Sequence, residues 1–147
     1  NMDHAELRHA IMYKAFDLFV FDDDSFNWNK EVFSLYDRLR NEAILANNKQ
    51  IANRAHNTKP SFRLEKYTGD YKHEMLGNVN VSVVNNSLEL NCNDFLKLNA
   101  SHWHYNTFQS NKNNRYKTKV MFNFKINQSG QIDELEIFGN RFIKINL

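Results

Sequence analysis

"NVNVSVVNNSLELNC", residues 78–92, contains the clearest structural signal in this chain. Apolar residues occupy every second position on both sides of a central asparagine pair: Val79, Val81 and Val83 before it, and Leu88, Leu90 and Cys92 after it. A period of two places the apolar side chains of a strand on one face, and Asn85–Asn86 favours a tight turn between two strands. The stretch therefore predicts a β-hairpin with one apolar face.

Strand-like segments continue on both sides of this hairpin. They are KYTGDYKH (66–73), FLKL (95–98), SHWHYNTFQ (101–109), the alternating run of Val120, Phe122, Phe124 and Ile126, QIDELEIF (131–138) and NRFIKINL (140–147). NQSG (127–130) has the composition of a turn. About eight short strands joined by short turns predict a small antiparallel barrel or a strongly curled sheet.

The first part of the chain has a helical period instead. One apolar stripe contains Leu7, Ala10, Ile11, Ala15, Leu18 and Phe19, and a second contains Trp28, Val32, Leu35, Leu39, Ala43 and Ala46. Asn27 is the predicted N-cap of the second helix, so we expect an antiparallel helical pair. A polar stretch up to Pro60 is the linker candidate. The prediction is an α+β chain with helices and linker in residues 1–60 and a barrel in residues 61–147.

Composition excludes several classes of function. The 147 residues carry a formal net charge of +2, which gives no long-range field for a polyanion, and no segment has the length and apolarity of a membrane span. The basic run NKNNRYKTK (111–119), with Lys112, Arg115, Lys117 and Lys119 around Tyr116, is more typical of a solvated loop than of a nucleic-acid site. The single cysteine, Cys92, excludes an internal disulfide.

Signatures of catalysis are missing from the sequence. No serine is followed by lysine three residues later, none lies in a nucleophile elbow, and the four glycines are too dispersed for a phosphate-binding loop. Cys92 occupies an alternating apolar position and is expected to be a small buried hydrophobe rather than a nucleophile. We predict no catalytic residue and no cofactor in this chain.

The stretch SHWHYNTFQ allows three interpretations. Strand alternation places His102 and His104 on one face, where a zinc ion would need a third ligand from His73, Glu74 or Asp94. The interpretation that we favour is that Trp103 and Tyr105 pack into the barrel while the histidines occupy the other face. If the barrel instead holds a small apolar ligand, its wall would be formed by Trp103, Tyr105, Phe122 and Phe124.

Residues 62–145 resemble domain of unknown function family 3471, a module found at the C-terminus of β-lactamase-like, penicillin-binding-protein-like serine hydrolases. The matching features are Tyr67, Gly69 and Tyr71, Gly77 before the valine strand, the run His102-Trp103-His104-Tyr105 with Phe108, and the closing Phe142. Asn106 departs from the pattern, in which aspartate is expected. The helical half, in segments such as AFDLFVFDDDSFNW (15–28), resembles the last helices that precede this module.

The resemblance implies a lipocalin-like barrel that acts as a non-catalytic accessory domain and shapes or covers the cleft of a serine hydrolase domain in the same parent protein. It also implies that this chain is the C-terminal part of a longer protein from the periplasm or cell envelope. The alternative is an independent module that binds a small apolar ligand. If the chain is such a part of a hydrolase, its helical stripes lack the surface that normally covers them, and we expect homo-oligomers formed through residues 1–56.

Overall fold

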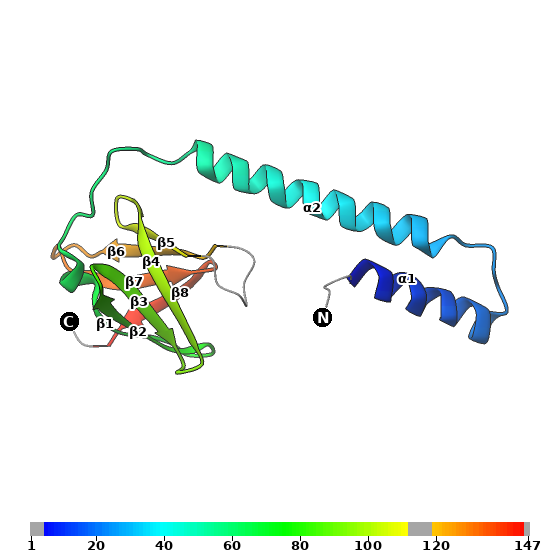
Figure 1. The fold of residues 1–147 in the computed structure, drawn as a ribbon. Coiled ribbons are helices and arrows are strands. Elements are labelled where there is room, and N and C mark those ends of the chain that lie inside the picture. Colours follow the sequence, from blue (N-terminus) through cyan, green and yellow to red (C-terminus); the bar gives the residue numbers. More distant parts are fainter. Residues whose placement is uncertain (1–4, 112–118, 146–147) are drawn as a thin grey trace. The chain divides into compact units, whose positions relative to one another are not determined.

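The computed structural model describes residues 5–111 and 119–145. The chain divides into two compact units, residues 1–53 and 54–147, which correspond to the helices and to the barrel with its preceding segment. Helices come first and a closed eight-stranded antiparallel barrel follows, which confirms the predicted α+β class. Figure 1 shows both units with their elements labelled.

The helical unit is an antiparallel pair. Helix α1 (Ala5–Phe16) continues into a π-helical turn, η1 (Asp17–Phe21), and α2 spans Trp28–Ala52. Asn27 is the N-cap of α2, because its Oδ1 accepts the Lys30 N–H at 3.0 Å, as predicted. The Tyr36 hydroxyl lies 2.8 Å from His9 Nδ1 and connects the two helices near the start of α1.

The two helices bury little apolar surface against each other. Ala10 and Val32 are the buried apolar side chains of the described part of this unit. Leu7, Ile11, Leu18 and Phe19 of the first stripe are 43% to 87% exposed, and Leu35 and Leu39 of the second are 41% and 48% exposed. Most of both predicted stripes is therefore uncovered within the described residues.

Eight strands in a meander form the barrel. They are β1 (Gly69–His73), β2 (Gly77–Val84), β3 (Ser87–Cys92), β4 (Leu96–His104), β5 (Thr107–Ser110), β6 (Met121–Ile126), β7 (Ile132–Ile137) and β8 (Asn140–Lys144). Each strand pairs antiparallel with the next, and β8 pairs with β1 to close the sheet. A short 3₁₀ helix, η2 (Leu64–Tyr67), precedes β1.

The turns that the sequence predicted between β2 and β3 and between β6 and β7 are present. Asn85 and Asn86 have φ values of 49° and 59°, the left-handed pair that a two-residue hairpin turn requires. In the NQSG turn, Asn127 Oδ1 accepts the backbone N–H groups of Ser129 and Gln131, each at 3.0 Å. Short polar side chains that bond to their own turn explain why these positions interrupt the strands.

One strand boundary differs from the prediction. Residues 96–98 of FLKL and the first half of SHWHYNTFQ belong to the single strand β4, and the chain turns inside the second stretch, at Tyr105 and Asn106. Tyr105 has a φ of +44°, which no strand residue adopts. Because a tyrosine carries no turn signal, alternation alone could not locate this reversal.

The alternating apolar residues fill the interior of the barrel. The fully buried side chains include Tyr67, Tyr71, Leu88, Leu90, Phe108, Phe122 and Leu135. Up-and-down connection places the β2–β3, β4–β5 and β6–β7 turns at one end, which we call the linker end, and the β1–β2, β3–β4 and β7–β8 turns at the other, the tip end (Figure 1). No helix in the described ranges combines the length and the apolarity needed to cross a membrane.

Candidate functional site

The segment that follows α2 is bound to the β4–β5 hairpin at the linker end. Arg54 Nε donates to the carbonyl oxygen of Trp103 at 2.9 Å, and its guanidinium carbon lies 4.2 Å from the centroid of the Trp103 ring. The Ala55 N–H donates to His104 Nδ1 at 3.2 Å. These contacts join residues 49 positions apart in the sequence.

Two further contacts continue this attachment around the turn. Thr58 Oγ1 accepts the Tyr105 N–H at 3.1 Å, and Asn106 Oδ1 accepts the Ser61 N–H at 3.0 Å. We call these paired residues the linker clamp: Arg54, Ala55, Thr58 and Ser61 on the incoming segment, and Trp103, His104, Tyr105 and Asn106 on the hairpin. Residues 103–106 of the SHWHYNTFQ run therefore bind the segment that precedes the barrel.

The expected direction of the Trp103 side chain is wrong. Leu98 and Ala100 of β4 are buried in the core, so the alternation places His102 on the inner side and Trp103 on the outer side. His102 pairs with the core residue Phe108, and their ring centroids lie 5.7 Å apart. Trp103 is only 9% exposed because Arg54 covers it from outside.

Tyr105 also differs from the expectation that it packs into the barrel. Its side chain is 60% exposed, and it lies in the turn rather than in a strand. A register shift between His102 and His104 precedes this turn and ends the regular alternation of β4. The bulge and the turn together send Tyr105 to the surface.

Both histidines of the run have hydrogen-bonding partners in the protein. His102 Nε2 lies 3.0 Å from the carbonyl oxygen of Tyr105, and His104 Nδ1 accepts the Ala55 N–H. Across the described ranges, no three His, Cys, Asp or Glu side chains converge in a way that could hold a metal ion. His73, the first proposed third ligand, instead caps the β1–β2 turn by accepting the N–H groups of Met75 and Leu76 at 3.1 and 3.2 Å.

Asn106 has a structural role that no sequence pattern indicated. Its Oδ1 accepts the Tyr67 hydroxyl at 2.5 Å as well as the Ser61 N–H, and its backbone carbonyl oxygen accepts the Phe124 N–H at 3.0 Å. Both side-chain contacts use an oxygen acceptor, which an aspartate also provides. The departure from the family pattern at this position therefore preserves the hydrogen-bonding role.

The tyrosines beside Asn106 are neutral. Burial raises the pKa of the Tyr67 hydroxyl above its ordinary value, an effect that the nearby backbone N–H groups of Phe62 and Ser61 oppose. Burial raises the pKa of Tyr71 still further, with added repulsion from Asp133 and Tyr67. Tyr71 donates its hydroxyl proton to the carbonyl oxygen of Tyr67 at 2.8 Å.

The four residues proposed as a ligand wall do not come together. Phe122 and Phe124 are 0% and 2% exposed inside the barrel, whereas Trp103 lies under Arg54 and Tyr105 lies on the surface. Phe124 packs edge-on against Tyr67 and Phe108, with centroids 5.1 and 5.7 Å away. These rings fill the centre of the barrel by packing against each other, and they do not line a common cavity.

A groove does open at the linker end of the barrel. It has a volume of about 470 Å³, its floor includes Phe62, Leu64 and Phe108, and its rim includes Arg63 and His102. Apolar side chains below a few polar ones are typical of small-molecule sites at barrel mouths. Of the predicted site residues, only His102 contributes to this groove.

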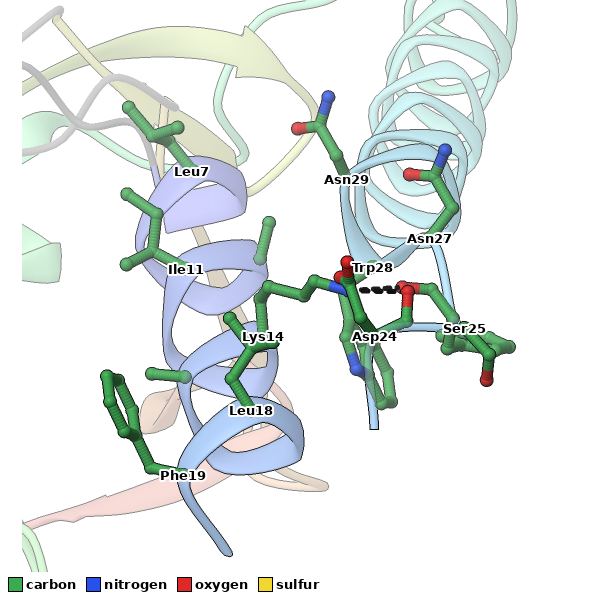
Figure 2. A pocket seen from close by; sticks show the side chains of 13 residues that line it. Leu7, Ile11, Lys14, Leu18, Phe19, Asp24, Ser25, Asn27, Trp28 and Asn29 are labelled. Atoms are coloured by element: carbon green, nitrogen blue, oxygen red, sulfur yellow. Dashed lines mark hydrogen bonds and ion pairs between the residues drawn. The ribbon is translucent and has the colours of Figure 1, made fainter. Parts of the chain in front are cut away.

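A larger apolar groove lies within the helical unit (Figure 2). Its volume is about 620 Å³, and Leu7, Ile11, Leu18 and Phe19 follow one side of α1 and η1 along it. Lys14 at its edge forms an ion pair with Asp24 and donates to the carbonyl oxygen of Phe26 at 3.3 Å. Lys14, the one cation among the described residues that line this groove, is therefore paired, whereas Ile11 and Phe19 along it are exposed.

Two further candidates from the sequence are Cys92 and the basic run 111–119. Cys92 is a free, partly buried thiol packed against the core, and burial raises its pKa, which disfavours the reactive thiolate. In the basic run 111–119, Lys112, Arg115, Tyr116 and Lys117 lie outside the described residues. Lys119 is described, and its Nζ donates to Gln109 Oε1 at 3.2 Å.

The barrel and its clamped leading segment define a class of protein module: a closed eight-stranded antiparallel barrel that follows a helical segment. The family model for the domain of unknown function DUF3471 matches residues 53–145, and the chain belongs to this family. The match begins beside Arg54, so it includes the linker clamp.

A solved structure, the C-terminal domain of a penicillin-binding protein, has a similar fold. Its TM-score is 0.52 at 20% sequence identity, and the alignment covers 63% of this chain and 94% of that chain. At this identity the likeness is one of fold. No curated protein matches this chain.

Proposed function

We propose that this chain is a non-catalytic accessory region of a larger serine hydrolase of the β-lactamase and penicillin-binding-protein class, located in the periplasm or cell envelope. Membership of DUF3471 and the fold of a penicillin-binding protein's C-terminal domain support this proposal. In it, the helices pack against the hydrolase domain, and the barrel helps to shape or cover the substrate cleft.

The open groove of the helical unit is the observation that carries the proposal. Ile11 is 61% exposed and Phe19 is 87% exposed along a groove of about 620 Å³. Soluble proteins rarely leave contiguous apolar surface of this kind uncovered, so a partner surface is expected on it. A preceding hydrolase domain in the same polypeptide is the partner that the family context supplies.

The linker clamp adds a mechanical argument. Four pairs of residues fix the segment between helix and barrel to the β4–β5 hairpin. A flexible tether would need no such contacts, because Gly- and Ser-rich chains connect domains without them. The clamp therefore fixes where residues 54–61 run over the barrel.

The proposal is tested on the sequence of the parent protein, on the activity of this chain alone and on its binding to the separate hydrolase domain. We expect a serine-x-x-lysine motif upstream in the reading frame, and no hydrolysis of a chromogenic β-lactam or ester by this chain alone. The separate hydrolase domain should bind this chain in calorimetry, and Leu18→Glu with Phe19→Glu should abolish that binding. Ile145→Glu, which changes an exposed residue of the barrel unit, is the matched control. Equal binding by all three chains, or turnover by the isolated chain that a serine substitution abolishes, would contradict the proposal.

A second candidate function is supported by the groove at the barrel mouth. Its volume of about 470 Å³ and its apolar floor suit a small amphipathic molecule near His102. This is the independent binding module, with the ligand at the mouth rather than in the packed interior. A thermal-shift screen with small amphipathic compounds, repeated with Phe108→Ala and with Ile126→Ala as a control, distinguishes this alternative.

A further inference from the structure

Large apolar side chains protrude from two neighbouring turns at the tip end of the barrel. Met75 and Leu76 of the β1–β2 turn are 89% and 47% exposed, and Phe138 of the β7–β8 turn is 73% exposed. These turns are neighbours because β8 pairs with β1 (Figure 1). We call these three residues the apolar tips.

Phe138 is an unfavourable residue for its backbone position. It has a φ of 51° and is followed by Gly139 at 75°, a two-residue hairpin turn in which asparagine or aspartate is preferred at the first place. A bulky side chain is strained in this left-handed conformation, and the exposed ring gains no burial to offset that strain. Burial among the described residues does not account for a phenylalanine at this position, which points to a contact outside them.

Cations flank the apolar tips. Lys72, on the outer face of β1, is exposed and lies opposite Asn78 and Ile143 rather than opposite an acid. Arg141 follows the β7–β8 turn and is exposed, with Glu134 3.7 Å from its Nε and Glu136 opposite it in register.

Other ionisable groups close to the tips limit this positive charge. Glu74, in the β1–β2 turn, is exposed. Glu136 already has Lys125 Nζ at 3.1 Å, and the His73 Nδ1 atom is held by the turn N–H groups. Asp94, in the β3–β4 turn, is exposed as well, and its neighbour Asn93 donates its side-chain N–H to the carbonyl oxygen of Leu76 at 2.9 Å. Lys72 has no acid opposite it in either of its two strand pairings.

The shape of this surface selects the kind of partner. The apolar tips line neither of the two grooves described above, and all three side chains are exposed to solvent. The linker end, at the opposite end of the strands, is where the incoming chain is bound. Exposed apolar side chains beside a cation fit a lipid surface. The apolar side chains can enter its headgroup region, and the lysine can contact lipid phosphates there.

We propose that the tip end of the barrel binds the surface of an anionic lipid bilayer. The apolar tips enter the headgroup region, and Lys72 and Arg141 meet the lipid phosphates. No part of the chain crosses the bilayer in this arrangement. The inference is independent of the hydrolase proposal, because it rests on the barrel tips alone.

Flotation of the full chain with vesicles tests the proposal. Vesicles of phosphatidylcholine with phosphatidylglycerol should carry the protein upward, and pure phosphatidylcholine vesicles should carry severalfold less. Phe138→Asn should reduce the bound fraction about tenfold, because one buried aromatic ring contributes about that factor to binding. Lys72→Glu should weaken binding to the anionic vesicles only.

The Phe138→Asn variant also excludes unfolding as a cause. Asn-Gly is the preferred pair for this turn, so its thermal midpoint should rise while lipid binding falls. Ile126 lies at the linker end and is 39% exposed, so the control variant Ile126→Ser should leave flotation unchanged. Absence of flotation by the original chain overturns the proposal. Self-association that Phe138→Asn abolishes, without lipid binding, would assign the tips to a second copy and overturn it equally.

Discussion

Asn106 is the point at which the incoming segment, η2 and the β4–β5 turn meet. One oxygen atom of its side chain accepts both the Tyr67 hydroxyl and the Ser61 N–H. Buried donors that lose their acceptor retain the cost of their desolvation, so the effect of a substitution depends on whether an oxygen remains at this place. Substitutions of Asn106 can therefore distinguish the effect of the oxygen acceptor from the effect of side-chain shape.

We predict that Asn106→Asp retains stability and Asn106→Leu does not. The leucine variant should lose about 1–3 kcal/mol of unfolding free energy, because the hydroxyl of the buried Tyr67 is left without its acceptor, whereas the exposed Ser61 N–H can bond to water. Urea denaturation measures both variants, with Asn123→Leu, a substitution of an exposed strand asparagine, as the control. Equal losses for aspartate and leucine would show that amide shape matters rather than the oxygen.

The two histidines allow a second prediction at this scale. His102 and His104 each have a polar partner in the protein, and their expected third ligands are not gathered with them in the described residues. Protein purified without added metal should contain no stoichiometric zinc by elemental analysis. One zinc per chain that disappears in a His102→Ala, His104→Ala variant would restore the metal-site interpretation.

At the scale of elements, the barrel was readable from the sequence to a large extent. Alternation predicted the β2–β3 hairpin and the closing strands, because side chains in strands alternate whatever their partners are. In β4 the alternation set by Leu98 and Ala100 places His102 inside and Trp103 outside, and a bulge and the Tyr105–Asn106 turn then end the strand. The prediction from sequence used the opposite phase and assigned Trp103 to the wrong side of the sheet.

The linker clamp makes a prediction about local opening. Arg54→Ala should speed hydrogen exchange at the Ala55 amide, since the guanidinium contact with Trp103 contributes about 1–2 kcal/mol to holding this segment. Core strand amides such as those of Val81 and Leu90 should keep their protection. Lys59→Ala, in the same segment, is the matched control. Loss of protection throughout the barrel would show that the clamp is part of its core stability.

At the scale of the whole molecule, the uncovered helical stripes make a prediction about the isolated chain. Without another domain on the groove that contains Leu18 and Phe19, a second copy should cover it, because an open apolar surface of this size favours association. Light scattering should show a dimer or larger assembly through residues 1–56, and a chain of residues 54–147 should be monomeric. A strictly monomeric full chain at high micromolar concentration would contradict this.

The sequence by itself determined the order of helices and strands, the turns built from asparagine and glycine, and most of the buried residues, because these depend on periodicity and short-range hydrogen bonding. Only the tertiary structure decided that the barrel closes, that Arg54 covers Trp103, and that Asn106 joins Ser61 to Tyr67. The clamp contacts connect residues 45 to 49 positions apart. A linear pattern contains no information about such pairs until the closed sheet brings them together.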